Sequence, residues 1–168
     1  MLQPVRRRTW AARGMTPEVV PSAAHDRWSV ITALTVSPER QRLGLYFQGF
    51  RHNICGVDCE LFVWALRQHL RRPLTIIWDG LSAHKTAANA LRDTDSKISF
   101  HRFPAYAPQL NPVEFVWAHA KHGCLANVCP ADWVDLGKRV KDTLLATRRH
   151  QALLRSFFSS ANLTLDFR

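Results

Sequence analysis

Two carboxylates in the middle of the chain occupy positions that suit metal-dependent chemistry. Asp79 is the first polar residue after the apolar run LTIIW, which predicts a buried strand, and an acid there lies at the usual ligand edge of a sheet. Asn111 can cap a helix and Pro112 suits its first turn, which places Glu114 in that same turn. The alternative for each acid alone is structural, either a turn aspartate before a glycine or a capping-box glutamate.

The segment between the two acids predicts how they are brought together. Glu114 follows Asp79 by 35 positions, and the intervening residues predict a helix over Thr86–Arg92 and a strand over Ile98–Phe103. This helix and strand return the chain to the same edge of the sheet. We therefore expect the end of the first strand to meet the start of the helix that carries Glu114.

The residues around both acids resemble those of a known family. WDGLSAHK and FPAYAPQLNPVEFVWAHAK are similar to the catalytic core of mariner-superfamily insertion-sequence transposases, in the "six-thirty" group, which belong to the DDE transposases and integrases. The resemblance implies an α/β fold of the RNase H-like (retroviral-integrase-like) class, with a mixed sheet flanked by helices. In that family three acids, Asp, Asp and Glu, hold two Mg²⁺ (or Mn²⁺) ions for DNA cleavage and strand transfer. Asp79 matches the second acid and Glu114 the third.

The same resemblance predicts that the first acid is absent. LQPVRRRTWAARGMTP looks like the segment that closely follows the first catalytic Asp, so the first, central strand is expected to lie upstream of Met1. Asp26 and Asp58 are the candidates for a substitute, but neither is predicted at the carboxyl end of a strand, and neither is assigned. We expect an amino-terminally truncated domain that folds poorly and has little activity unless an upstream fragment complements it.

The charge of the chain favours a polyanionic partner. The 168 residues include 23 Lys and Arg against 13 Asp and Glu, a formal net charge of +10, which favours nucleic acid, with a merely basic soluble protein as the alternative. The family resemblance implies that the partner is DNA, namely the transposon ends and the target. The start of the chain lacks the apolar core of a signal peptide, and no apolar run has the length of a membrane span. We expect a cytoplasmic, nucleoid-associated protein, and a homodimer because transposases act on paired ends.

Several further residues are candidates to assist the acids. His84 matches a histidine of the family's Asp-x-x-x-x-His stretch and is expected in the strand-to-helix loop, where it either orients the site, contacts DNA or is a surface residue. Lys85 and Lys121 either touch phosphate or are simply solvated. The arginines expected to contact DNA, with solvated charge as the alternative, are Arg6, Arg7, Arg8, Arg13, Arg139, Arg148 and Arg149.

The rest of the chain predicts a regular order of elements. Branched and aromatic residues predict a hairpin of strands over Trp28–Val36 and Leu43–Phe50, followed by a helix over Val57–Leu70. Beyond residue 123 the apolar stripe Trp133, Leu136, Val140 and Leu144 predicts helices. The expected organisation is a basic arm over 1–25, an RNase H-like core over 26–123 and carboxyl-terminal helices over 124–168.

Three functions stay open on these grounds. The chain is the truncated part of an active transposase, a decayed remnant that binds DNA nonspecifically, or, remotely, a zinc-stabilised DNA-binding module. The zinc hypothesis rests on C-x3-C and C-x4-C pairs, whose spacings differ from the tight C-x2-C of many zinc sites. Ordinary thiols in a reducing cytosol are the favoured reading of Cys55, Cys59, Cys124 and Cys129.

Overall fold

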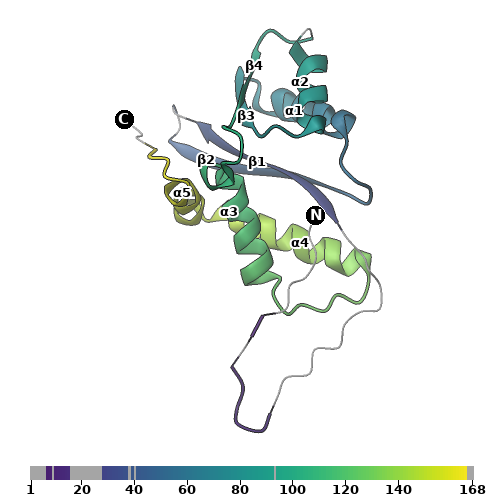
Figure 1. The fold of residues 1–168 in the computed structure, drawn as a ribbon, viewed down its shortest axis with the longest axis vertical. Coiled ribbons are helices and arrows are strands. Elements are labelled where there is room, and N and C mark those ends of the chain that lie inside the picture. The colour runs from purple at the N-terminus through teal and green to yellow at the C-terminus, as the bar shows by residue number, and fades with distance from the viewer. Residues whose placement is uncertain are drawn as a thin grey trace.

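A computed structural model describes residues 7–8, 10–15, 28–37, 39, 41–92 and 94–165. Figure 1 shows two groups of elements on either side of a long hairpin. In chain order the elements are β1 (Ser29–Ser37), β2 (Arg42–Phe50), α1 (Gly56–Leu70), β3 (Leu74–Trp78), α2 (Ser82–Arg92), β4 (Ile98–Arg102), a 3-10 turn (Pro108–Leu110), α3 (Pro112–His119), a π-helical turn (Ala120–Cys124), α4 (Trp133–Arg149) and α5 (Gln151–Ser160). Within the described part of the chain, no helix has the length and apolar character needed to cross a membrane.

The strands form two separate pairs. β1 and β2 are antiparallel, with Ser29 opposite Phe50, which confirms the predicted hairpin. β3 and β4 are parallel, with Trp78 opposite Arg102 at their carboxyl ends. Among the described residues no strand pairing joins the two sheets. Each sheet therefore belongs to its own packing unit.

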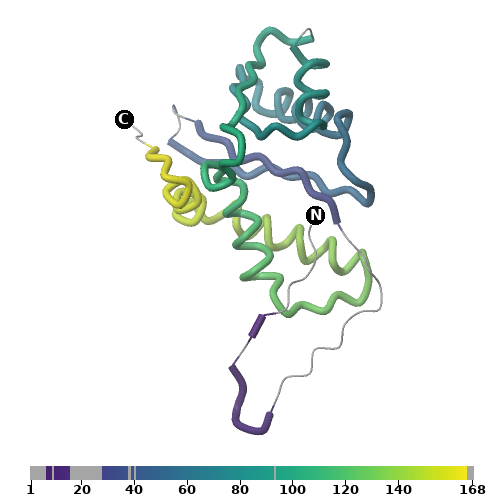
Figure 2. The backbone as a smooth tube through the Cα atoms, in the orientation of Figure 1, coloured from purple at the N-terminus to yellow at the C-terminus, as the bar shows by residue number. Residues whose placement is uncertain are grey.

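The hairpin lobe, which we define as β1, β2, α3, α4 and α5, contains the larger core. In Figure 2 the three helices lie along one side of the hairpin, and they contact its strands, α3 against β1 and both α4 and α5 against β2. The predicted stripe on α4 is confirmed in Leu136, Val140 and Leu144, which are buried, while Trp133 is half-buried. These side chains pack with Leu45 of β2 and Val116 of α3.

Trp28 packs between the hairpin and α4 and connects them by a hydrogen bond. Its indole N–H donates to the carbonyl of Trp133 at 2.9 Å. The ring lies so close to Gly49 of β2 and Gly137 of α4 that a Cβ added at either position would overlap it. Glycine is therefore required at both positions for the indole to fit between strand and helix.

The β3 lobe, which we define as α1, β3, α2 and β4, is built around a smaller cluster. Val63, Leu91 and Ile98 are buried together, and half-buried side chains of β3 and β4 pack against them. The starts of α1 and α2 are in close contact, since a Cβ on Gly56 would lie 2.7 Å from the side chain of Thr86. The glycine at position 56 therefore lets α1 pack closely against α2.

Candidate active site

Asp79 lies immediately after β3, as predicted, and its carboxylate is held by two donors. Oδ1 accepts the backbone N–H of Leu81 at 3.0 Å and lies 2.6 Å from Nδ1 of His84. Both contacts fall on the same oxygen, and Oδ2 has no hydrogen-bond partner among the described residues. The side chain is 46% exposed. Asp79 is thus a turn residue and, at the same time, an oriented carboxylate with one oxygen directed away from its partners.

His84 lies within a helix, so its expected placement in a loop was wrong. α2 begins at Ser82, four residues before the predicted start at Thr86, and the N–H of Lys85 already donates to the carbonyl of Leu81 at 3.1 Å. The polar residues of this first turn hide the periodicity, which becomes apparent only at the buried Ala87 and beyond. The helical turn brings the imidazole back over Asp79.

Glu114 is presented by the predicted cap and first turn. Oδ1 of Asn111 accepts the N–H of Val113 at 3.1 Å, and Pro112 is the first residue of α3. The N–H of Asn111 donates instead to the carbonyl of Pro108, at 3.0 Å, so Glu114 does not close a capping box. Its side chain is exposed and makes no hydrogen bond or ion pair within the described residues. The carboxylate is therefore free to take a ligand.

The two acids lie in different lobes and do not form a ready cluster. Among the described residues, no three His, Cys, Asp or Glu side chains are close enough together to hold a metal ion. The donor chemistry itself suits Mg²⁺ or Mn²⁺, because both acids offer unengaged carboxylate oxygens. A bound ion would therefore need further oxygen ligands besides these two acids.

Neither candidate for a substitute first acid takes that role among the described residues. Asp26 lies outside them. Asp58 occupies the first turn of α1, where Oδ2 accepts the N–H of Cys55 at 2.9 Å and also pairs with Nε2 of His52 at 3.0 Å. The Cys55 N–H is the main cause that holds the pKa of the Asp58 carboxyl below its ordinary 3.8. Asp58 is thus the capping-box residue of α1, three positions after the N-cap Cys55.

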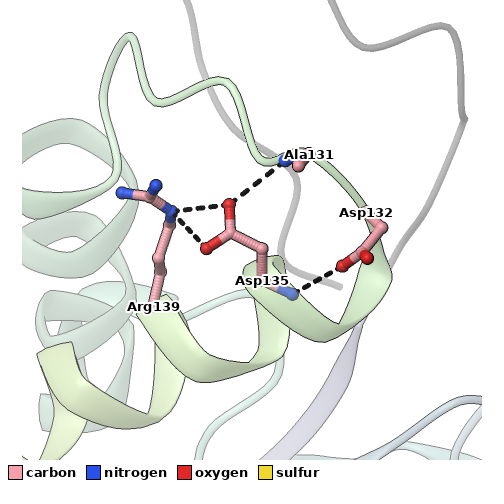
Figure 3. Close-up of polar contacts among 4 residues, drawn as sticks. All are labelled: Ala131, Asp132, Asp135 and Arg139. Atoms are coloured by element: carbon pink, nitrogen blue, oxygen red, sulfur yellow. Dashed lines mark hydrogen bonds and ion pairs between the residues drawn. The ribbon is translucent and has the colours of Figure 1, made fainter.

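Three of the arginines proposed to contact DNA have internal partners. In Figure 3, Nε of Arg139 bridges both carboxylate oxygens of Asp135, at 2.9 and 3.0 Å, and Asp135 also accepts the N–H of Ala131. Arg7 donates to the carbonyl of His122 at 2.6 Å. The guanidinium of Arg148 lies 5.1 Å from the centre of the Tyr46 ring.

The remaining basic candidates differ in exposure. Lys121 is half-buried in the π-helical turn that follows α3, and its position seven residues after Glu114, two turns along a regular helix, therefore does not place it on the same helical face. Arg6 lies outside the described residues. The exposed candidates are Arg8, Arg13, Lys85 and Arg149. One basic residue beside the turn that follows Asp79 was not predicted from the sequence.

That residue is Arg102, the last residue of β4. It is exposed and lies opposite Trp78 in the parallel register. Its Nε would be 3.4 Å from a Cβ added to Gly80, so the guanidinium lies directly beside the turn that follows Asp79. Its position at the end of a predicted strand could have indicated this role, since the last residues of adjacent parallel strands lie at the same sheet edge.

The cysteines do not form a common site in the described residues. All four are free thiols, and Cys59 is buried while the other three are exposed. Burial, with smaller effects of the charges of Asp58, Cys55 and Asp79, raises the pKa of the Cys59 thiol to about 11. Because zinc binds the thiolate, this shift opposes a zinc site at Cys59.

Comparison with known proteins places the chain in a family. The family model described as DDE superfamily endonuclease matches residues 1–136, and the chain belongs to this family. Among solved structures the chain is similar to one described as the crystal structure of the Mos1 Strand Transfer Complex, with 12% sequence identity and a TM-score of 0.58. The match covers 97% of this chain and 52% of that chain, so this chain spans about half of its length. None of the curated proteins compared with this chain matches it.

At this identity the likeness shows the fold. The α/β, RNase H-like class predicted from the sequence is confirmed.

Proposed function

We propose that the chain is the catalytic domain of a transposase, which cleaves and joins DNA with Asp79 and Glu114 as two of three metal-holding carboxylates. The observation that carries this proposal is the state of Asp79. It lies at the carboxyl end of a strand in a DDE superfamily endonuclease, with Oδ1 fixed by two donors and Oδ2 without a partner.

The chain's own residues have separate tasks in this proposal. When bound, a pair of Mg²⁺ or Mn²⁺ ions supplies activation of a water or 3′ hydroxyl and charge stabilisation at the leaving oxygen. Leu81 and His84 orient the carboxylate of Asp79, and α3 presents Glu114. The net charge of +10 attracts DNA, and Arg102 is positioned to contact a phosphate beside Asp79.

We further propose that a strand encoded upstream supplies the third acid. Within the described residues β1 pairs only with β2, and β3 pairs only with β4, so each sheet has two edges with unpaired backbone groups. A strand paired with one edge of each sheet would join the two lobes and bring its own carboxylate to the side of Asp79. In its absence we expect low activity and marginal stability.

A DNA-binding remnant without catalysis is the second candidate. Its support is the positive net charge together with the absence, among the described residues, of a group of three metal ligands. This candidate predicts DNA affinity that falls steeply with salt and no cleavage that depends on Mg²⁺.

The deciding experiment is a nicking assay on supercoiled DNA with Mg²⁺ or Mn²⁺. The chain is tested alone and after coexpression with the polypeptide encoded immediately upstream. We expect nicking only in the second case, and we expect Asp79→Asn and Glu114→Gln each to abolish it. Nicking that is indifferent to both variants, or no nicking in either case, would favour the remnant. The same preparations run on a sizing column test the proposed homodimer.

A further inference from the structure

Three rings from three different elements stack beside Asp79. Trp78 of β3 lies between the imidazole of His84 and the ring of Phe100. The Trp78 and His84 centroids are 4.7 Å apart at an interplanar angle of 3°, and the Trp78 and Phe100 centroids are 5.1 Å apart at 22°. In the β3–β4 register Phe100 lies opposite Ile76, so Trp78 and Phe100 are diagonal neighbours on one face of the sheet.

The stack extends the small core of the β3 lobe to the site. Trp78 and Phe100 are half-buried and pack against the buried Val63, Leu91 and Ile98. At the other end of the stack, the His84 side chain is 23% exposed. The position of the imidazole is thereby tied to the best-packed part of the lobe.

The contact with Asp79 defines which nitrogen of His84 carries a proton. An ionised carboxylate only accepts hydrogen bonds, so Nδ1 of His84, 2.6 Å from Oδ1 of Asp79, must be the donor. A neutral His84 is then the Nδ1–H tautomer, with Nε2 as an acceptor. A rotation of the ring out of the stack would break both the face contact with Trp78 and the bond to Asp79.

We propose that Trp78, supported by Phe100, is a positioning residue for the candidate active site. Its indole face holds the imidazole of His84 in the orientation and tautomer that fix Oδ1 of Asp79, which leaves Oδ2 for the reaction. The catalytic meaning of this arrangement rests on the proposed function, whereas the arrangement itself is present in the protein without DNA or metal. Partners that orient a ligating side chain typically contribute about 10–100-fold to metal affinity or activity.

The first test measures the imidazole ¹⁵N chemical shifts of His84 in the full chain, without metal or DNA, at a pH where the ring is neutral. The wild-type protein should show a protonated Nδ1 and an unprotonated Nε2. Trp78→Leu should shift the pattern toward a mixture of tautomers. Trp78→Phe keeps an aromatic face and should show the wild-type pattern. Trp64→Leu, which removes an exposed indole from α1 of the same lobe, should change nothing.

A variant that keeps the indole covers the case in which Trp78→Leu does not fold. Phe100→Leu removes only the far ring of the stack, and we expect a smaller shift in the same direction. The proposal is overturned if the wild-type ring is the Nε2–H tautomer, or if folded Trp78→Leu and Phe100→Leu both keep the wild-type pattern.

Cleavage by the protein coexpressed with its upstream polypeptide gives the second readout. Trp78→Leu should lower the rate by about 10–100-fold, and it should add no further loss to His84→Ala if it acts through that ring. An additive loss in the double variant would overturn the proposed route through His84. If Trp78→Leu changes the His84 tautomer but neither the wild type nor any variant cleaves DNA, the positioning of His84 by Trp78 stands and the proposed function is rejected.

Discussion

The two acids lie in lobes of opposite character. The β3 lobe has the smaller core, yet two donors, the Leu81 N–H and His84, fix one oxygen of Asp79. His84 is in turn stacked on Trp78. The hairpin lobe has the larger core, yet the Glu114 side chain is exposed and makes no polar contact within the described residues. The order of a functional group therefore depends on its immediate neighbours rather than on the size of the core that carries it.

The largest expected effect is on the cleavage rate. It tests whether Asp79, which has hydrogen-bond partners, and Glu114, which has none within the described residues, are nevertheless equally important for the reaction. Asp79→Asn and Glu114→Gln should each lower the cleavage rate of the complemented protein by at least about a hundredfold, because each removes a charge worth several kcal/mol to the reaction. Only Asp79→Asn should also change the His84 signals of the chain without metal. Equal spectra for the two variants would contradict the comparison.

A substitution at Gly137 tests the packing of the hairpin lobe. An added methyl group would overlap the Trp28 ring, so Gly137→Ala should lower the free energy of unfolding by about 1–3 kcal/mol, measured by urea denaturation. Gly123→Ala is the matched control, since its Cβ would lie 3.9 Å from the nearest atom outside its own helix backbone, Nδ1 of His119. A similar loss of unfolding free energy in both variants would argue against tight packing of the Trp28 ring on Gly137.

The pH dependence of stability tests the start of α4. The hydrogen bond from Arg139, followed by that from the Ala131 N–H, holds the pKa of Asp135 below its ordinary 3.8. The unfolded chain thus binds this proton more tightly, so the ionised carboxylate stabilises the fold above about pH 3.8 and this contribution disappears as the pH falls through the lower folded pKa.

In thermal unfolding, Asp135→Asn should therefore have a lower Tm than the wild type at pH 6, and the difference should shrink as the pH approaches 2. A constant difference over this range would contradict the assignment.

The smallest expected effect is on the salt dependence of DNA binding, which distinguishes two arginines as DNA contacts. Arg102 lies beside Gly80, in the turn that follows Asp79, without a polar partner in the described residues, whereas Arg139 is paired with Asp135. Arg102→Ala should reduce the slope of log affinity against log salt by about 1, while Arg139→Ala should leave it nearly unchanged. The measurement is DNA binding by fluorescence anisotropy over a salt series. A larger change for Arg139→Ala would reverse the comparison.

Local chemistry made much of the site predictable from the sequence. The apolar run before Asp79 is β3, and Asn111 caps α3 at the predicted place, because both signals depend on only a few adjacent residues. The predicted burial of that strand was wrong, since Ile77 is 55% exposed and no residue of β3 is fully buried. The start of α2 was predicted four residues late, because the polar residues of its first turn mask the helical pattern. The family resemblance then supplied the RNase H-like class, which no local signal contains.

Contacts between distant residues could not be predicted in the same way. The position of Trp28 between Gly49 and Gly137 depends on how α4 packs against the hairpin. The stack at Trp78 requires the parallel β3–β4 register and a helix that begins early enough to return His84 over the strand. The π-helical turn at Lys121 likewise has no clear sequence signal.

The most direct test of the two-acid site uses Mn²⁺ as a paramagnetic substitute for Mg²⁺ in the protein complemented by its upstream polypeptide. Bound Mn²⁺ broadens the amide signals of nearby residues. We predict broadening of both the Asp79–Leu81 and the Val113–Glu114 amides, with loss of the effect in Asp79→Asn and competition by Mg²⁺. Broadening near one acid only, or at scattered surface carboxylates, would contradict a shared metal site.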